Sequence, residues 1–272
     1  MSWEDFEIRA LNYLKNNFKL KNINFTLLGG SNSNDKDIHV KLENKLLFVI
    51  EAKQNKSQIA QFVLIPDIIN KTFKLGNIKG SRKKTKNIIE FMDKNFKRFE
   101  SPTTKGIEIN CLDKFKFDCI DDYLEENNIQ FIITACKKNN IKIINKENFK
   151  NHFKANCIYR KKKSGSRDYK FSEDLKKNLI SHFNNLKDVI KDGKKTKLMF
   201  KLCEQFQIKK QRYFKINSEN MYLSPIKNNK NSFYLKKLSS TNNPTVIFQI
   251  EYKNNTKDDS DILKNILKKK IK

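Results

Sequence analysis

The spacing of apolar residues changes along the chain, and each spacing predicts a kind of element. In residues 2–18, Phe6, Ala10 and Leu14 recur at helical spacing, which predicts an amphipathic helix. Glu7 falls on the same apolar stripe, an unusual place for an acid. Its carboxylate is therefore expected to point inward.

Short apolar runs rich in β-branched residues predict strands. Residues 129–136 (IQFIITAC) are apolar throughout, which predicts a fully buried strand. The runs 36–42 and 45–53 flank a short turn at 43–44 and predict a hairpin. A further strand is expected over 23–30, where it ends in a Gly pair.

Helical spacing predicts further helices in the first half of the chain. The expected helices cover residues 57–73, with an interruption at Pro66, and residues 88–99 and 119–127. Residues 141–153 predict a short strand that continues into a helix.

The character of the sequence changes near residue 156. Residues 158–169 form a basic segment around Ser-Gly-Ser, which predicts a loop, and residues 172–190 predict a capped helix. Strands and a short basic amphipathic tail are expected at 221–225, 232–239, 245–252 and 261–272. We therefore expect an α/β domain over residues 1–155 and an α+β region over residues 156–272 packed on it.

The charge of the chain points to a polyanionic partner. Its 272 residues carry a formal net charge of +27, with a pI near 9.8. So large an excess creates a strong positive field and favours nucleic acid. Only six of the 57 basic residues are Arg, so an AT-rich genome that favours Lys codons is an alternative source of part of this charge.

Several function classes are disfavoured by the sequence. The charged start lacks the apolar segment of a signal peptide, and no apolar run reaches membrane-spanning length. The five cysteines include no CxxC pair, which argues against zinc and disulfides and fits a reducing cytoplasm. No Walker-type phosphate loop occurs, so an NTP-driven motor is not supported.

The candidate chemistry lies in the hairpin of residues 36–53. Alternation along a strand places Glu51 and Lys53 on one face. If residues 43–45 close the turn, the paired numbers sum to 88 and Asp37 lies directly across from Glu51. A two-residue turn would shift the register by one and flip the relative faces. We therefore expect the three-residue turn.

Two opposed carboxylates suggest a cation. Their repulsion costs about 0.2–1 kcal/mol, and a divalent cation between them reverses its sign. Hard oxygen ligands suit Mg²⁺, and Lys53 beside them can orient water or neutralise a phosphoryl group. The alternative is an exposed salt bridge of Lys53 with Glu51 or Asp37, since such residues mostly lie at the surface.

These residues resemble the PD-(D/E)XK nuclease superfamily. The resemblance rests on GGSNSNDKDIHV (29–40), ten residues, and then EAK (51–53), with Lys-Asp in place of the frequent Pro-Asp. It implies a restriction-endonuclease-like core over residues 1–155, with a central mixed sheet flanked by helices. It also implies a Mg²⁺ site and a Lys that assists the attacking water. The implied catalytic residues are Asp37, Glu51, Lys53 and Glu7, with Glu4 as second candidate to Glu7, and the implied metal ligands are Asp37, Glu51 and Ala52.

The second half resembles the C-terminal parts of some bacterial type II restriction endonucleases. The similar segments are KKSGSR (162–167) and the strands that end in NPTVIFQIEY (243–252). The resemblance implies a bacterial cytoplasmic enzyme that cuts double-stranded DNA at a specific sequence, with a separately encoded methyltransferase. One site per chain and a duplex substrate suggest a homodimer on a palindrome.

Candidate DNA contacts come from polar and basic segments near these motifs. Gln can read adenine, Arg is the preferred reader of guanine, and Lys more often meets phosphates. A solvated surface is the alternative for each. The candidates are Ser31, Ser33, Gln54, Gln58, Arg82, Lys83, Arg160, Lys162, Ser164 and Arg167.

Two other functions stay open. A structure-specific nuclease of the Holliday-junction type would share the catalytic motif, although such enzymes are usually much shorter. A basic DNA- or RNA-binding protein with a decayed nuclease fold would share the charge and would lack cleavage.

Overall fold

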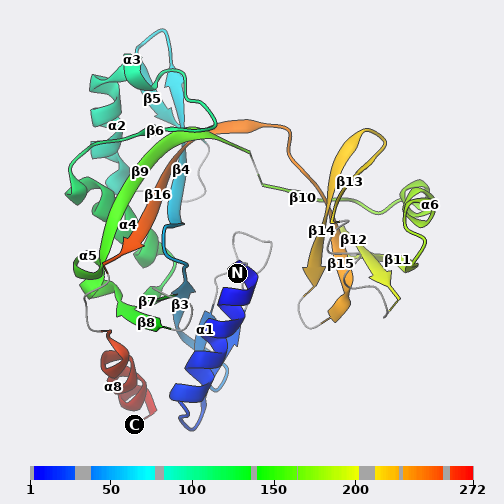
Figure 1. Ribbon diagram of the computed structural model, residues 1–272, viewed down its shortest axis with the longest axis horizontal. Coiled ribbons are helices and arrows are strands. Elements are labelled where there is room, and N and C mark those ends of the chain that lie inside the picture. The colour runs from blue at the N-terminus through cyan, green and yellow to red at the C-terminus, as the bar shows by residue number, and fades with distance from the viewer. Residues whose placement is uncertain are drawn as a thin grey trace. The chain divides into compact units, whose positions relative to one another are not determined.

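The chain forms two compact units in the computed structural model (Figure 1). The first comprises Met1–Lys162 together with Asn243–Lys272, and the second comprises Lys163–Asn242. The structure describes residues 3–27, 38–76, 83–135, 140–163, 165–201, 212–226, 229–253 and 258–271.

The first unit is built around a five-stranded mixed sheet. The pair β3–β7 is parallel and the other pairs are antiparallel. The central mixed sheet expected from the sequence is therefore present. In spatial order its strands are β1 (Ile23–Leu27), β2 (Ile38–Leu42), β3 (Lys45–Ala52), β7 (Ile129–Ala135) and β8 (Ile141–Asn145).

Two terminal helices share a core with one face of this sheet. The helix α1 (Trp3–Asn17) packs against β1 and β3, and α8 (Ser260–Ile271) packs against β8. Their buried apolar residues join those of β3 that point to this side, including Ile50. Both ends of the described chain thus cover the same face of the sheet.

The opposite face shares a larger core with more helices and a second sheet. The helix α4 (Asp113–Glu126) contacts both β7 and β4. The other helical segments here are η1 (Lys83–Thr85), α2 (Lys86–Lys94), α3 (Phe96–Phe99), η2 (Lys146–Asn148) and α5 (Phe149–His152). The second sheet has the order β5 (Thr72–Leu75), β4 (Ser57–Asp67), β16 (Asn242–Tyr252), β9 (Phe153–Lys163) and β6 (Ile107–Glu108).

The helix expected over residues 57–73 is wrong, because this segment forms the β4–β5 hairpin. Ala60, Phe62 and Leu64 alternate into the core at a period of two. The residues between them are also partly apolar, so the run lacked a clear period. A continuous apolar run cannot be assigned to helix or strand by spacing alone.

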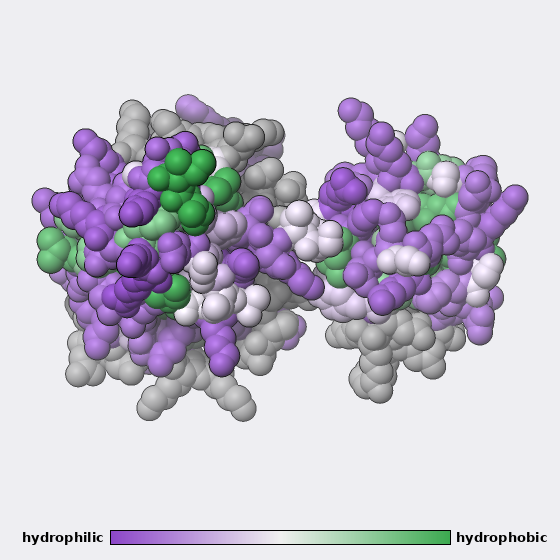
Figure 2. Space-filling view, turned by 90° about the horizontal axis from the view of Figure 1, so that it is seen from above, coloured by the Kyte–Doolittle hydropathy of each residue, from purple (hydrophilic) through white to green (hydrophobic). Residues whose placement is uncertain are grey.

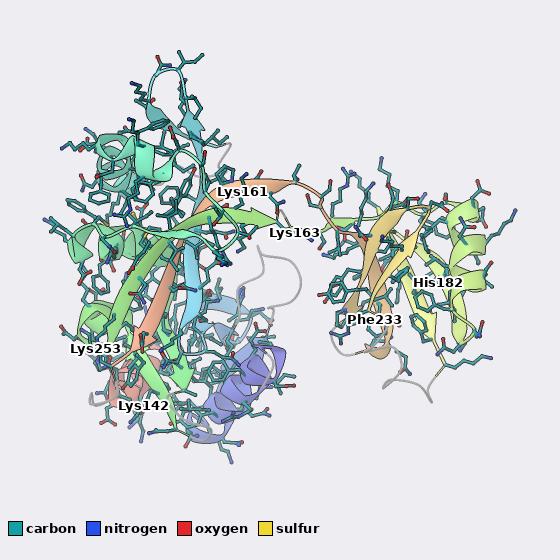
Figure 3. The ribbon with its side chains drawn as sticks, turned by 45° about the horizontal axis from the view of Figure 1, so that its top comes forward. Lys142, Lys161, Lys163, His182, Phe233 and Lys253 are labelled. Carbon is teal, nitrogen blue, oxygen red and sulfur yellow. The ribbon has the colours of Figure 1, made fainter. Side chains whose placement is uncertain are left out.

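The second unit has its own sheet and core. Its sheet has the order β11 (Leu186–Asp192), β12 (Lys195–Phe200), β15 (Asn229–Lys237), β14 (Glu219–Ile226) and β13 (Tyr213–Ile216), and β10 (Arg167–Asp168) pairs with β15. The helix α6 (Glu173–His182) contributes Leu175 and Leu179 to the core. Figure 3 labels His182 at the end of α6 and Phe233 on β15.

The second half corrects three expectations. The basic segment 158–169 is not all loop, because β9 continues to Lys163 with alternating burial. The helix expected over 172–190 ends at His182, although the Ser172 Oγ accepts a hydrogen bond from the Leu175 N–H at 3.2 Å and caps its start as expected. The division into units also differs from 1–155 and 156–272, since residue 155 lies within β9 and β16 returns the chain to the first unit.

The face shown in Figure 2 is mostly hydrophilic where it is coloured, with a few apolar areas. The β4–β5 hairpin exposes Ile65, Ile68, Ile69 and Leu75. Among the described residues, no helix is long and apolar enough to cross a membrane. Cys111, Cys119 and Cys157 are buried, as expected for small apolar residues.

Candidate functional site

The register of the β2–β3 hairpin decides which side chains can meet. Ile38 pairs with Ile50 and Val40 with Phe48, so these paired numbers sum to 88 as expected. The expected three-residue turn is wrong, because Leu42 pairs with Lys45 across a two-residue turn.

A bulge reconciles the two observations. The register shifts between Val40 and Lys41, whose partners are Phe48 and Leu46, so Leu47 is the extra residue. A bulge of this kind restores the alignment that a short turn would otherwise shift by one. Asp37 itself lies outside the described residues.

Glu51 lies near the carboxyl end of β3 and is only 3% exposed. Ile50 and Ala52 point into the core shared with α1 and α8, so alternation sends Glu51 to the opposite face, beside Val49. There it lies next to Ile132 of β7, which pairs with Glu51 in parallel register.

Two donors bind the same oxygen of Glu51. The Lys53 Nζ lies 2.9 Å from Glu51 Oε1, and the Tyr123 hydroxyl donates a hydrogen bond to that oxygen, also at 2.9 Å. Lys53 is held in place by its N–H, which donates to the Ile133 carbonyl at 2.9 Å. The site therefore combines a buried carboxylate, an ammonium and a phenol from two elements.

This geometry tests the alternative drawn from the sequence, an exposed salt bridge between Lys53 and Glu51. The Glu51–Lys53 pair exists, yet the Glu51 side chain is 4% exposed and that of Lys53 is 21% exposed. Burying a charged pair is costly unless its remaining polar atoms are satisfied. An exposed surface pair is therefore not what the strand end holds.

The donor set suits a hard cation but is incomplete within the described residues. There, Glu51 Oε2 has no hydrogen-bond partner, which leaves one carboxylate oxygen for a ligand. No group of three or more His, Cys, Asp or Glu side chains that could hold a metal occurs in the part of the chain that the structure describes. A second carboxylate, such as that of Asp37, would have to complete a Mg²⁺ site.

Glu7 is buried, with 8% of its surface exposed, as its place on the apolar stripe of α1 predicts. Its helix packs on the face of the sheet that holds Ile50, whereas Glu51 faces α4. The membership of Glu7 in the site therefore stays a prediction. The side chain of Glu4 lies outside the described set.

Thr134 was missed by the sequence reasoning. It lies on β7 two residues after Ile132, so it shares the face of Glu51 and is next to the position of Lys53. Thr134 is 1% exposed, and its Oγ1 is buried with no hydrogen-bond partner among the described residues. Strand alternation from IQFIITAC was the available signal.

A second polar cluster lies on β4 and β9. The Lys162 Nζ donates hydrogen bonds to Gln58 Oε1 at 2.7 Å and to Gln61 Oε1 at 2.6 Å. The Gln58 Nε2 donates to the same Gln61 oxygen at 2.9 Å. We call these three residues the Gln–Lys cluster. It joins two sequence-predicted DNA contacts, Gln58 and Lys162, which lie 104 residues apart.

The Gln–Lys cluster is electrostatically unusual. Burial, and secondarily the positive charge of Arg160, lowers the pKa of the Lys162 ammonium. The Arg160 Nε is itself buried with no hydrogen-bond partner in the described part of the chain. Two cations thus share one side of the sheet, and an anion there would relieve both.

A comparison with solved structures finds a similar chain. No family model matches the chain, and no curated protein matches it. The chain is similar to HhaI endonuclease in complex with DNA, with a TM-score of 0.67, 27% sequence identity, and coverage of 94% of this chain and 93% of that chain. This chain therefore has an endonuclease-like fold.

The other DNA contacts predicted from the sequence lie in different parts of this endonuclease-like fold or outside the described residues. The Gln54 carbonyl accepts a hydrogen bond from the Ser57 N–H at 3.1 Å, in the turn that leads from β3 to β4. Arg167 is exposed and belongs to the second unit, whereas Lys162 belongs to the first. Ser31, Ser33, Arg82, Ser164 and the side chain of Lys83 lie outside the described residues.

Proposed function

We propose that this protein is a Mg²⁺-dependent endonuclease that cuts double-stranded DNA at a specific sequence, in the manner of a type II restriction enzyme with a PD-(D/E)XK site. The observation that carries the proposal is the buried Glu51–Lys53 pair at the end of β3, in a chain similar to an endonuclease that was solved with DNA. The net charge of +27 supports a polyanionic substrate.

The carboxylates would hold the metal. Glu51 offers Oε2, the Ala52 carbonyl is adjacent on the same strand, and Asp37 precedes Ile38, whose partner is Ile50. If that register continued for one more residue, Asp37 would lie opposite Glu51. A bound Mg²⁺ supplies a Lewis acid that offsets the negative charge gathering on the phosphate.

Lys53 would act on the water. Its ammonium already lies 2.9 Å from Glu51, so a water that bonds to both groups would be oriented beside the phosphate. Hydrolysis adds this water across one P–O bond and leaves a phosphate on one fragment and a hydroxyl on the other. Glu7 stays a proposed additional acid for this site.

DNA contacts would come from both units. In the first unit, Arg160 and the Gln–Lys cluster offer cations and amide groups on one sheet. Arg167 would add a contact from the second unit, and the predicted Ser and Arg contacts outside the described residues complete the set. A palindromic site read by a homodimer, and a partner methyltransferase that protects host DNA, belong to the same proposal.

The test is cleavage of long linear DNA in Mg²⁺ by the wild type and by Glu51→Gln and Asp37→Asn variants. We expect discrete fragments from the wild type, because a specific enzyme cuts at a few sequences. Both variants are expected to lose cleavage and to keep DNA binding. The matched control is Glu90→Gln, which removes an acid from an exposed pair with Lys86 on α2 and should cut normally.

Wild-type rates from both site variants would overturn the catalytic assignment. Cleavage of branched but not of linear duplex DNA would favour a structure-specific nuclease. Tight binding with no Mg²⁺-dependent cleavage would favour a non-catalytic nucleic-acid-binding protein.

A further inference from the structure

Tyr123 lies where no sequence motif places a functional residue. It is on α4, 72 residues from Glu51, and its hydroxyl donates a 2.9 Å hydrogen bond to Glu51 Oε1. Its side chain also packs against the large apolar core of the first unit. The phenol therefore has an apolar body in the core and its polar end on the candidate catalytic carboxylate.

The way in which Glu51 is bonded fixes its orientation. Tyr123 and Lys53 approach the same oxygen, Oε1, so the carboxylate cannot turn without breaking both contacts. The other oxygen, Oε2, is thereby aimed away from both donors. Within the described residues Oε2 has no hydrogen-bond partner, which leaves it open to a metal ion.

The end of α4 is tied to the strand that carries Glu51. The Val49 N–H donates to the Asn128 carbonyl at 3.0 Å, and the Asn128 Nδ2 donates to the Leu47 carbonyl at 3.4 Å. Asn128 has φ = 51°, a left-handed conformation that Asn tolerates well and that ends the helix. The Asn127 Nδ2 donates to the Tyr123 carbonyl at 2.7 Å.

We propose that Tyr123 is a positioning residue that holds Glu51 Oε1 so that Oε2 faces the metal. The proposal rests on the function proposed above. Lys53 alone would serve poorly, because the same ammonium has to engage water and phosphate during the reaction. Tyr123 keeps one hydrogen bond on Oε1 when Lys53 moves to those groups.

The test compares Tyr123→Phe with Tyr159→Phe. Each change removes one hydroxyl, and Tyr159 donates its own hydrogen bond to the Leu64 carbonyl at 2.7 Å in the core of the same unit. Tyr159→Phe therefore controls for the loss of a phenolic hydrogen bond away from the carboxylate. Mn²⁺ binding is measured without DNA by electron paramagnetic resonance, and cleavage is measured as a function of Mg²⁺ concentration.

We expect Tyr123→Phe to bind Mn²⁺ and to use Mg²⁺ about 10–100-fold more weakly, the usual effect of losing a hydrogen bond that orients a metal ligand. Its affinity for DNA in the absence of metal should equal that of the wild type. Mn²⁺ should also raise the melting temperature of the wild type and of Tyr159→Phe more than that of Tyr123→Phe. This shift reports on the folded protein even if Tyr123→Phe is less stable.

Equal Mn²⁺ affinities for Tyr123→Phe and Tyr159→Phe would overturn the positioning role. That result is distinct from failure of the proposed function, in which the wild type itself would not cut DNA or Glu51→Gln would cut normally. Loss of metal binding in both Tyr variants would also overturn it, because the effect would then be one of general stability.

Discussion

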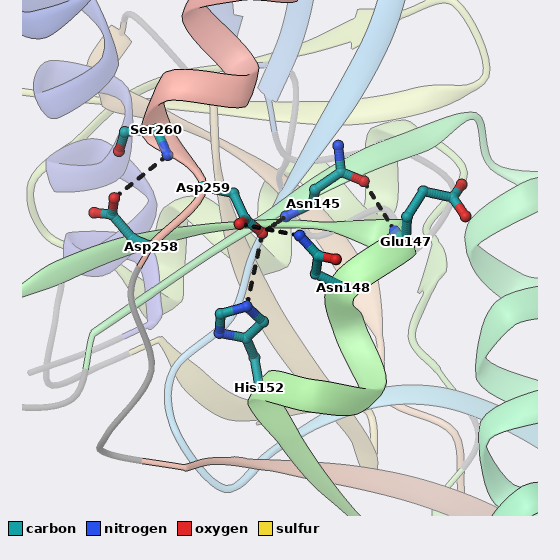
Figure 4. Close-up of polar contacts among 7 residues, drawn as sticks. All are labelled: Asn145, Glu147, Asn148, His152, Asp258, Asp259 and Ser260. Atoms are coloured by element: carbon teal, nitrogen blue, oxygen red, sulfur yellow. Dashed lines mark hydrogen bonds and ion pairs between the residues drawn. The ribbon is translucent and has the colours of Figure 1, made fainter.

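Asp259 is expected to stabilise the packing of the C-terminal helix α8 on the rest of the first unit. Its carboxylate accepts hydrogen bonds from the Asn145 N–H at 2.8 Å and from the Asn148 Nδ2 at 3.1 Å (Figure 4). His152 Nε2 lies 3.8 Å from the same carboxylate. The Asp259 N–H donates to the Ile143 carbonyl at 2.7 Å, so one residue joins the start of α8 to β8 and α5.

The cost of Asp259→Ala follows from these contacts. Asp259 is 8% exposed, so the groups that it bonds gain little access to water when the carboxylate is removed. A hydrogen bond to a charged acceptor contributes about 1.5–3 kcal/mol and a neutral one about 0.5–1.5 kcal/mol. We expect the free energy of unfolding to fall by about 2–4 kcal/mol. The melting temperature should then fall by roughly 5–15 °C for a domain of this size class.

Thermal unfolding followed by circular dichroism measures this change. The matched control is Asp258→Ala, which removes the neighbouring acid and only a 3.3 Å contact with the Ser260 N–H. Asp258→Ala should melt within about 2 °C of the wild type, since changes at such weak contacts are usually small. Equal melting temperatures for the two variants would refute the reasoning.

Two further predictions concern pH and salt. Burial lowers the pKa of His152 below its ordinary value of 6.5, although the charge of Asp259 opposes the shift. The unfolded chain therefore binds this proton more tightly than the folded chain, so the free energy of unfolding should fall as pH drops below about 6.5. His152→Gln should flatten the plot of melting temperature against pH between about pH 7 and pH 5. Parallel plots for the variant and the wild type would contradict this. Lys162→Met should make the plot of log DNA affinity against log salt concentration less steep by about 0.9, the value for one phosphate contact. The control Lys97→Met, at an exposed position, should leave the slope unchanged. Equal slopes for Lys162→Met and the wild type would exclude the contact.

The sequence predicted the part of the site that lies on one hairpin, but for a partly mistaken reason. The predicted pairing sum of 88 is present at Ile38 and Ile50, although the turn has two residues. Leu47 supplies the extra residue as a bulge, and a bulge has no strong signature in KLLFVI. Local alternation could therefore place Glu51 and Lys53 together, whereas the register depended on a defect within the strand.

Contacts between distant segments could not be predicted in this way. Because the spacing in residues 57–73 indicated a helix, β4 was not predicted. The sheet pairing that brings Gln58 and Gln61 to Lys162 across β16 was therefore not predicted either. The bond of Tyr123 to Glu51 depends in turn on α4 crossing the face of the first sheet. Spacing reports which side of an element is buried but not what lies against that side. Side chains that share one hairpin are therefore easier to predict from sequence than contacts between distant elements, and the Tyr123 and Lys162 variants test two such contacts.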